Sequence, residues 1–415
     1  MGSAVRPAVR RIAALLVSAA LASAVPGCAN GSGASSADEA TTITALDYYT
    51  DSTEHAQWGA RLTACGRTAG VKVEHRSVPG PALVPTVLRQ ASSRTPPDLL
   101  MLDNPDVQQV ARTGMLTPLS RYGIDYSGYA PGILSAGTYK GQVYGLAPAV
   151  NTVALFYNKD MLAEAGVAVP RTWDELEAGA AALTRPGRYG LAVDANATFE
   201  GSWQFLPFLW SNGGKETELD SPQAAQALQL WVDLVRSGSV SRSALNWNQA
   251  DVHDQFAAGK AAMMINGPWR ISALKEVRDL HWGIAPLPVR KKGQSVVTPL
   301  GGEVWTVPRS ASEARQEKAA QVLACLNSPR DSLAVAKAYS TVPSRTSLAA
   351  EYAEQTPSMA VFADAVRKAR ARTSRVGVEW PKVATGIYTA IQSALTGEAT
   401  PEEALRRAQR IATGS

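Results

Sequence analysis

Polar and aromatic side chains gather where strand-like runs pass into helix-like stretches. Glu54 follows the apolar run TITALDYY, Asp103 and Asn104 end DLLMLDN, and Trp269 comes after AAMMIN. In an open α/β sheet, ligand-facing residues lie just beyond the carboxyl ends of the strands. Carboxylates and amides exchange several hydrogen bonds each, and an indole offers a flat apolar face. This set predicts a site for a polyhydroxylated ligand, whose hydroxyls need partners and whose C–H faces stack on rings.

These side chains also have structural interpretations. Carboxylates at helix starts, such as Glu54 and Asp103, commonly serve as caps. Asn151 could satisfy backbone groups where a strand crosses, and Tyr48 and Arg345 fit either role. Four tryptophans have apolar neighbours at helical spacing, which favours packing; they are Trp58, Trp173, Trp210 and Trp231.

Enzyme and metal chemistry have little support in the motifs. The chain has 4 histidines, and they show no paired spacing for a metal. No GxSxG elbow, Walker loop or GxGxxG occurs, and the SxxK of Ser272 to Lys275 lacks the companion SDN and KTG motifs. We therefore expect no catalytic residue, no metal and no cofactor. Asp103 and Glu303 could still be taken for a glycosidase pair.

Strand-like and helix-like patterns alternate from Thr42 onward. TITALDYY, VKVEHRSV and DLLMLDN are separated by helical stretches, a rhythm typical of a mostly parallel sheet covered by helices. Thr172 is a predicted N-cap before WDELEAGAAALT. Further helices are predicted over residues 222–237, 253–258, 315–326, 332–338, 358–371 and 400–412.

Composition and charge narrow the class of protein. The 415 residues are 45% hydrophobic and 19% charged, which is enough for a sizeable core split over two lobes. There are 41 basic residues against 36 acidic ones, but three arginines precede Cys28, and without them the net charge falls from +5 to +2. No basic footprint for nucleic acid remains. The 10 Trp and 12 Tyr against 6 Phe favour rings with a polar edge, which suit a wet cleft.

The amino terminus predicts export. Three arginines precede the apolar run IAALLVSAALASAV, and Pro26, Gly27 and Cys28 follow it, so residues 1–27 read as a signal peptide. Val25, Gly27 and Cys28 resemble a lipobox, with Pro26 as an unusual occupant; a plain signal peptide is the alternative. Residues 28–41 have the small, polar composition of a flexible tether. Cys65 and Cys325 remain, and in an oxidising compartment they form either a disulfide or two separate buried thiols.

Longer segments resemble a known family. YGLAPAVNTVALFYNKDM from Tyr144, FAAGKAAMMINGPW from Phe256, GIAPLPV from Gly283 and TPLGGEVWTVP from Thr298 are similar to bacterial extracellular solute-binding proteins of the maltose-binding type (family 1). The resemblance extends over nearly the whole mature chain, including GEATPEEALRRAQ at its end. FYNKD, TWDEL and NGPW together are specific. The resemblance implies the lipoprotein component of a carbohydrate importer driven by an ATP-binding cassette (ABC).

The implied fold is the two-lobed, type II periplasmic-binding-protein fold, α/β with mostly parallel sheets flanked by helices. A hinge of three segments would lie near residues 147–152, 299–305 and 343–347. The resemblance divides the chain into an N-terminal lobe of residues 42–147 and 303–343 and a C-terminal lobe of residues 152–298 and 348–415. This mapping puts Cys65 and Cys325 in one lobe and favours the disulfide.

The resemblance also implies binding residues. Trp269 corresponds to a sugar-stacking aromatic, and Asp103 and Asn104 correspond to hydroxyl binders of the first lobe. The other implied ligand-binding residues are Glu54, Asn151, Gly301, Gly302, Glu303, Trp203, Trp247, Glu379 and Trp380.

The expected function is capture of a sugar, a di- or oligosaccharide, by a monomer anchored through Cys28 to the outer face of the cytoplasmic membrane. The expected partners are the sugar and the membrane permease subunits, which work with a cytoplasmic ATPase; no nucleic acid is expected. Two alternatives stay open: a secreted carbohydrate-active enzyme, and the same fold binding a glycerophosphodiester or a polyamine.

Overall fold

The computed structural model describes residues 41–414. The predicted signal peptide, Cys28 and the tether before residue 41 lie outside the described residues. Within residues 41–414, no helix combines the length and the apolar character that a membrane crossing requires.

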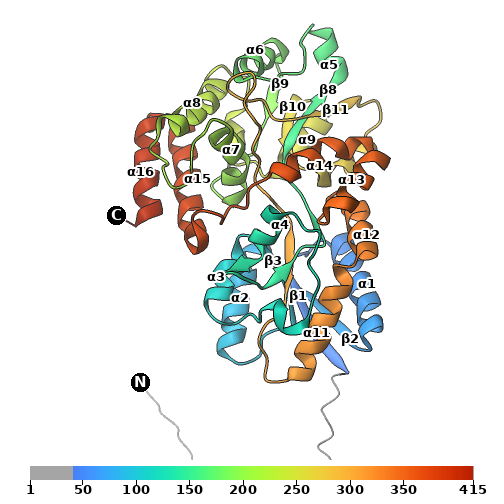
Figure 1. The fold of residues 1–415 in the computed structure, drawn as a ribbon. Coiled ribbons are helices and arrows are strands. Elements are labelled where there is room, and N and C mark those ends of the chain that lie inside the picture. The colour runs from blue at the N-terminus through green and yellow to red at the C-terminus, as the bar shows by residue number, and fades with distance from the viewer. Residues whose placement is uncertain (1–40, 415) are drawn as a thin grey trace, which may run out of the picture. The chain divides into compact units, whose positions relative to one another are not determined.

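The first lobe is built on a five-stranded sheet with the strand order β2-β1-β3-β12-β6 (Figure 1). Leu99 to Leu102 in β3 are completely buried, which fits an apolar central strand covered on both faces. Asp103 ends β3 and lies opposite Glu303 of the neighbouring β12. The strands are β1 (Thr42–Asp47), β2 (Lys72–Ser77), β3 (Leu99–Asp103), β6 (Gly145–Leu146) and β12 (Glu303–Thr306).

The second lobe is built on a four-stranded sheet with the order β11-β8-β10-β9. Its centre is β10, in which every residue is buried, and whose carboxyl end leads directly to Trp269. Two short ladders form separate two-stranded sheets, β4 (Thr138–Tyr139) with β5 (Gln142–Val143) and β7 (Ala149–Val150) with β13 (Val342–Pro343). The strands of the second sheet are β8 (Ala154–Asn158), β9 (Tyr189–Ala192), β10 (Ala261–Asn266) and β11 (Trp282–Ala285).

Both sheets mix parallel and antiparallel pairs, whereas the sequence pattern and the family resemblance predicted mostly parallel ones. The βαβ rhythm does produce the parallel pairs β1–β2, β1–β3 and β10–β9. The pairs of β8 with β10 and β11, and of β12 with β3 and β6, are antiparallel. The two-lobed α/β architecture itself is confirmed.

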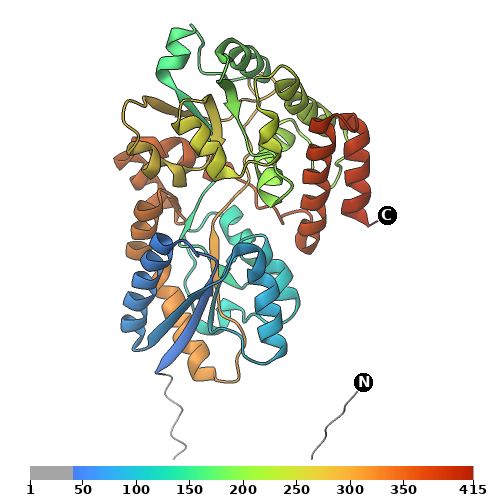
Figure 2. The ribbon, with the colours of Figure 1, turned by 180° about the vertical axis from the view of Figure 1, so that it is seen from behind.

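Helices cover both sheets (Figures 1 and 2). Thr172 caps α6 as predicted, in a capping box with Glu175. Before β12 the chain forms α1 (Ser52–Ala69), α2 (Gly80–Ser92), α3 (Asp106–Arg112), α4 (Pro131–Ala136), α5 (Lys159–Glu164), α6 (Trp173–Leu183), α7 (Phe199–Ser211), α8 (Pro222–Arg236), α9 (Gln249–Ala257) and α10 (Ile271–Lys275). After β12 it forms α11 (Glu313–Leu326), α12 (Pro329–Tyr339), α13 (Thr346–Gln355), α14 (Ala360–Lys368), α15 (Trp380–Thr396) and α16 (Pro401–Thr413). Short 3₁₀ helices are η1 (Leu119–Tyr122), η2 (Arg242–Leu245), η3 (Pro268–Arg270), η4 (Pro357–Met359) and η5 (Gly377–Glu379).

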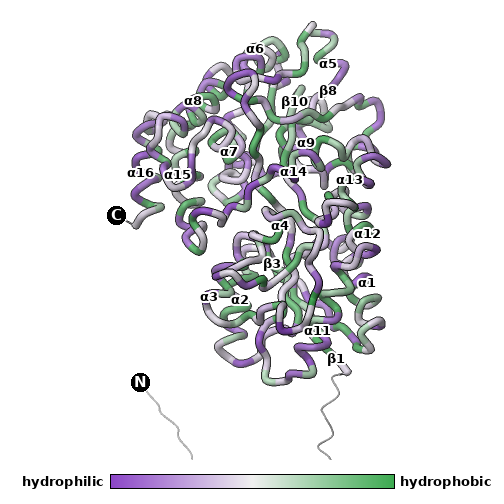
Figure 3. Tube along the Cα trace, viewed as in Figure 1, coloured by the Kyte–Doolittle hydropathy of each residue, from purple (hydrophilic) through white to green (hydrophobic). Residues whose placement is uncertain are grey.

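Hydrophobic residues follow the strands and the inner sides of the helices, whereas hydrophilic residues occupy the outer turns (Figure 3). The carboxyl-terminal pair α15 and α16 packs on α7 and α8 of the second lobe. Phe205, Phe208 and Trp231 form edge-to-face ring pairs in that core. Trp210 and Trp231, which the sequence assigned to packing, are buried there.

Backbone pairing joins the segments that pass between the two sheets. β7 (Ala149–Val150) pairs with β13 (Val342–Pro343). One residue further on, Asn151 and Gly301 exchange two backbone hydrogen bonds, at 3.1 and 2.9 Å. These contacts bring together chain segments that are far apart in the sequence.

Cys65 and Cys325 form a disulfide that joins α1 to α11. Of the two alternatives that the sequence left open, the bridged form is therefore the one present. The bridge closes a loop with a sequence separation of 260 residues and holds together two helices that also pack on each other.

Candidate functional site

A cavity of about 590 Å³ lies between the two lobes, and both sheets and the crossing segments contribute to its wall. Trp269, on η3, projects from the second lobe. Its indole lies directly over Gly267, because a Cβ built on that glycine would come within 1.9 Å of Trp269 Cζ3. Glycine at this position therefore allows the ring to lie against the backbone. A partly exposed indole at the edge of a polar cavity can stack on an apolar ligand face.

The first lobe contributes a pair of carboxylates on neighbouring strands. Arg372 Nη2 donates to Asp103 Oδ1 at 2.7 Å, and the Arg372 guanidinium lies 4.5 Å from the ring centroid of Trp203. Tyr48 Oη donates to Glu303 Oε1 at 2.7 Å. Burial raises the pKa of Glu303, and the hydrogen bond from Tyr48 opposes this shift. Both carboxylates are thus held in fixed positions at the cavity wall.

Glu54 also lines the cavity, in the first turn of α1. The N-cap of this helix is Asp51, which accepts from the backbone N–H groups of Thr53 and Glu54. Asp51 therefore caps this helix, and Glu54 does not, although the position of Glu54 at the helix start favoured a cap. Burial raises the pKa of Glu54 and Asp51 adds to this, whereas Arg270 from the second lobe lowers it.

The crossing segments form the floor of the cavity. Asn151, Gly301 and Gly302 all line it. Gly302 has φ +121°, which side-chain-bearing residues rarely adopt. A Cβ on Gly301 would come within 2.1 Å of Asn151 Oδ1 and 2.5 Å of Trp203 Cη2. Both glycines are required by close packing at the place where the sequence predicted a hinge.

The structure therefore brings most of the predicted site residues to one cavity. Those that line it are Trp269, Asp103, Glu54, Asn151, Gly301, Gly302, Glu303 and Trp203.

Four predicted residues lie elsewhere. Asn104 is buried behind the wall, where its Nδ2 donates to the backbone oxygens of Leu300 and Gly302. Trp247 packs edge-to-face on Tyr189. The remaining two lie at the start of α15: Glu379 pairs with Arg112 and Lys382 at the surface, and Trp380 is completely buried in the core. For these four the prediction of a cavity-wall position was wrong, because VGVEW continues into a core helix and NWNQ packs on a strand.

Other residues line the cavity although the sequence either did not predict them as ligand-binding or left their role undecided. They are Tyr48, Tyr49, Asp51, Trp58, Phe199, Glu200, Asn248, Arg270, Tyr339 and Arg372. Tyr49, Trp58 and Tyr339 form a stack with ring centroids 5.5–6.2 Å apart. Arg270 follows Trp269 directly and could have been found from the NGPW motif. Arg372 lies in no strand or helix, and no local signal marks it.

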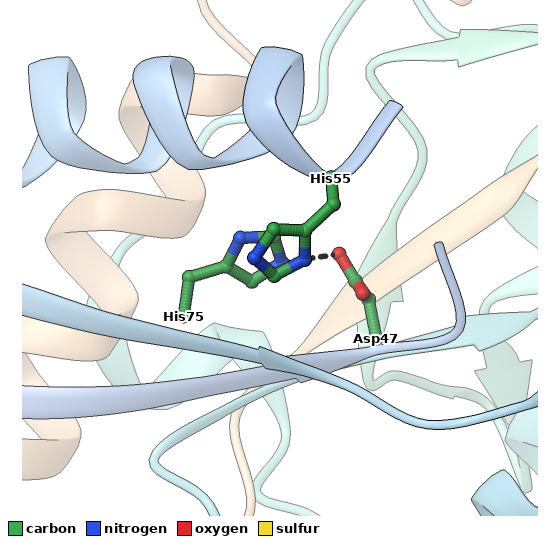
Figure 4. A group of neighbouring side chains, drawn as sticks. All are labelled: Asp47, His55 and His75. Atoms are coloured by element: carbon green, nitrogen blue, oxygen red, sulfur yellow. Dashed lines mark hydrogen bonds and ion pairs between the residues drawn. The ribbon is translucent and has the colours of Figure 1, made fainter. Parts of the chain in front are cut away.

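Two of the four histidines come together, although their sequence spacing gave no sign of it. His75 Nε2 lies 2.7 Å from Asp47 Oδ2, and His55 Nδ1 lies 2.8 Å from Ser77 Oγ, which in turn donates to Asp47. The two imidazole rings stack 4.2 Å apart and nearly parallel (Figure 4). One ligand-type atom from each of Asp47, His55 and His75 lies within 4.8 Å of the other two. Asp47 Oδ1 also accepts a hydrogen bond from the backbone N–H of Tyr49 at 3.1 Å, which ties the group to the segment that carries the cavity tyrosines.

The comparisons with known proteins agree with this fold. The profile of the family described as bacterial extracellular solute-binding protein matches residues 60–363. The chain therefore belongs to the bacterial extracellular solute-binding protein family.

Individual relatives are distant. A putative binding protein of Brucella abortus is 28% identical over 236 residues, which cover 54% of this chain and 57% of the relative. The maltotriose-binding protein of Pyrococcus abyssi is 29% identical over 218 residues, or 51% of this chain and 45% of the relative. The chain thus matches about half the length of these curated relatives.

Solved structures match over a greater length. The maltose-bound MalE3 of T. maritima has a TM-score of 0.79 at 25% identity, covering 90% of this chain and 99% of that one. The cyclic α-maltosyl-1,6-maltose binding protein of Arthrobacter globiformis has a TM-score of 0.77 at 25% identity, covering 90% and 98%.

Proposed function

We propose that this protein captures a di- or oligosaccharide outside the cell and delivers it to the permease of an ABC importer, without chemical conversion. The cavity between the lobes is the observation that carries the proposal. Its wall combines the indole of Trp269 and the Tyr49–Trp58–Tyr339 stack with carboxylates from both lobes. Rings for C–H faces and acceptors for hydroxyls are the two requirements of a sugar site. The named specificities of the maltose- and maltotriose-binding relatives support the same ligand class.

The lobes would close on the sugar around the three crossing segments near residues 147–152, 299–305 and 343–347. We assign residues 42–147 and 303–343 to the first lobe and residues 152–298 and 348–415 to the second. The backbone bonds between Asn151 and Gly301 support a hinge here, because they tie two crossings together at the cavity floor. A sugar stabilises closure only to the extent that it binds the closed form more tightly.

Anchoring through a lipid on Cys28 would keep the protein at the outer face of the cytoplasmic membrane, where the permease accepts the ligand. The segment before residue 41 supports this proposal through its sequence alone, with a basic start, an apolar run and a lipobox-like cysteine.

Catalysis is disfavoured by the arrangement of the carboxylates. Asp103 and Glu303 belong to adjacent strands of the first lobe and lie on the same side of the cavity. Each is also engaged, Asp103 by Arg372 and Glu303 by Tyr48. A glycosidase pair must flank the scissile bond, with one group free to act as an acid.

The purified chain should be screened by thermal shift against mono-, di- and oligosaccharides, with glycerophosphocholine and spermidine as non-sugar probes. We expect an oligosaccharide to raise the melting temperature and to be recovered intact by chromatography. Shortened products would indicate an enzyme, and stabilisation only by a non-sugar probe would replace the proposed ligand class.

Trp269→Ala tests the site directly. We expect sugar affinity to fall at least about tenfold, because the stacking surface is lost, while the melting temperature changes little. Trp282→Ala is the matched control, since Trp282 is a partly buried indole of β11 outside the cavity. Equal calorimetric affinities for Trp269→Ala and the unaltered protein would contradict the proposed site.

A further inference from the structure

Asp47, His55 and His75 come together between helix α1 and the first sheet (Figure 4). His55 lies in the first turns of α1, Asp47 ends β1, and His75 lies on the neighbouring strand β2. One ligand-type atom of each residue lies within 4.8 Å of the other two. Two imidazoles and one carboxylate are a set of ligands that suits zinc and related divalent metals.

The closest pair of atoms in this group nearly has the spacing of two metal ligands. His75 Nε2 lies 2.7 Å from Asp47 Oδ2. Two atoms that each bind the same zinc ion at about 2.0–2.2 Å lie about 3 Å from each other. His75 and Asp47 therefore need to move apart only slightly to bind one ion between them.

His55 is the adjustable member of the group. It is partly exposed, its Nδ1 lies 2.8 Å from Ser77 Oγ, and its ring stacks on that of His75 with 9° between the planes. A turn of the His55 ring about its Cβ–Cγ bond, out of this stack, would replace the contact with Ser77 by a bond to the ion. The partial exposure of His55 also gives an ion access from solvent.

The surroundings of Asp47 favour a cation. Its side chain is completely buried, and among residues 41–414 the basic group that pairs with it is His75, with no lysine or arginine. A buried carboxylate requires compensating positive charge as well as hydrogen bonds. The second oxygen, Oδ1, accepts from the backbone N–H of Tyr49 at 3.1 Å and from Ser77 Oγ. Hydrogen bonds of this kind orient the carboxylates that bind metals.

We propose that Asp47, His55 and His75 bind one divalent transition-metal ion, zinc above all. The ligands are Asp47 Oδ2, His75 Nε2 and a ring nitrogen of His55, and water completes the coordination from the exposed side. The ion joins β1, β2 and α1 at one point and should therefore stabilise the first lobe. This site goes beyond the capture of a sugar and does not depend on it.

The proposed metal site is connected to the cavity through the chain itself. Asp47 and His55 lie at the two ends of the segment 48–54, whose cavity-lining residues are Tyr48, Tyr49, Thr50, Asp51 and Glu54. An ion bound at both ends restricts this segment before the ligand arrives, so less conformational freedom is lost on binding. Zinc should therefore raise the sugar affinity. This coupling rests on the proposed function, whereas the metal site does not.

Calorimetric titration of the full chain with zinc chloride, after treatment with EDTA and dialysis, tests the site. We expect one zinc ion per chain to bind in addition to any that His55→Ala binds, and zinc to raise the melting temperature. His55→Ala removes one ligand at a partly exposed position and should lower the zinc affinity at least about tenfold, with the fold checked by circular dichroism.

His281→Ala is the matched control. His281 Nδ1 lies 2.8 Å from Asp160 Oδ2 at the surface, in a histidine–carboxylate contact without a second histidine. This variant should bind zinc as the unaltered protein does. Zinc binding that is absent from the unaltered protein, or equal in His55→Ala and the unaltered protein, would overturn the proposed site and leave a hydrogen-bonded group alone.

Cobalt(II) gives a second readout that needs no variant. A cobalt ion held by two imidazoles and a carboxylate with few waters absorbs visible light more strongly than the hydrated ion, because its geometry differs. We expect such bands when cobalt(II) is added to the metal-free protein, and we expect zinc to remove them. A spectrum identical to that of cobalt(II) in buffer would overturn the site.

The coupling is tested with maltotriose, or with the saccharide that binds best in the screen. Its affinity for the unaltered protein should be about fivefold higher with zinc than with EDTA, whereas His55→Ala should show no difference. Equal affinities with zinc and with EDTA in the unaltered protein would overturn the coupling but not the metal site. Failure of every saccharide to bind would overturn the proposed function and the coupling, while the zinc titration would still decide the metal site.

Discussion

At the scale of single residues, the cavity depends on glycines as much as on the side chains that line it. Gly267 has φ −100°, a value that any residue adopts, so its importance comes from space alone. The indole of Trp269 occupies the volume that a side chain at Gly267 would need. Trp269 can hold its position in the cavity only while residue 267 lacks a Cβ.

Gly267→Ala should therefore weaken sugar binding about tenfold or more by displacing the Trp269 ring, although it adds only a methyl group. Calorimetric titration measures the affinity, and circular dichroism checks that the fold is kept. Gly80→Ala is the matched control, because a Cβ at Gly80 meets no atom within 4 Å. Unchanged affinity in Gly267→Ala would show that the ring position seen here is not the one that binds sugar.

Single residues also differ in how well their place in the site can be predicted from the sequence. Asp103 ends the buried strand β3 and Trp269 follows the buried strand β10, and the rule that ligands bind beyond the carboxyl ends of strands finds both without other information. Arg372 could not be found in this way, because it acts through contacts with Asp103 and Trp203, far away in the sequence.

At the scale of elements, local signals predicted the helices well and the sheet pairing poorly. Thr172 with Glu175, and Thr400 with Glu403, mark helix starts through residues that lie three apart. The antiparallel placement of β12 beside β3 depends on a segment that returns from the other lobe. Pairing between strands so far apart in the sequence produces no repeating pattern of apolar residues in either strand.

The disulfide between α1 and α11 is an element-scale feature with a measurable effect. A cross-link between residues 260 apart restricts the unfolded chain strongly, and removing it should cost about 2–5 kcal/mol of the free energy of unfolding. Urea unfolding of the Cys65→Ala, Cys325→Ala double variant checks this value. Sugar affinity should stay unchanged, because neither cysteine lines the cavity. Equal urea midpoints for the double variant and the oxidised protein would contradict this expectation.

At the scale of the whole described chain, the two-lobed arrangement was predicted from motifs that resemble a known family rather than from the alternation of apolar runs. FYNKD and NGPW lie on β8 and at the end of β10, two strands that pair in the second sheet. The alternation of apolar runs predicts α/β layers but does not determine how many sheets there are. The cavity exists because the chain divides its strands between two sheets, and this division is not a local property.

Two oppositely charged side chains, one from each lobe, line the cavity. Glu54 on α1 of the first lobe and Arg270 after β10 of the second influence each other's pKa: burial raises that of Glu54 and lowers that of Arg270, and each opposes the shift of the other. Closing the lobes would bring the two groups nearer and remove water between them. Their attraction should therefore favour the closed form, and added salt should weaken it.

Glu54→Gln should weaken sugar binding by about 1 kcal/mol and reduce the salt dependence of the affinity. Because Glu54 could also contact the sugar itself, a double-mutant cycle with Arg270→Gln separates the two roles. A cross-cavity pair makes the double variant lose less affinity than the sum of the two single losses. Strictly additive losses would leave Glu54 as a ligand contact alone. Glu74→Gln, on the exposed edge strand β2 of the same lobe, is the control and should alter neither the affinity nor its salt dependence.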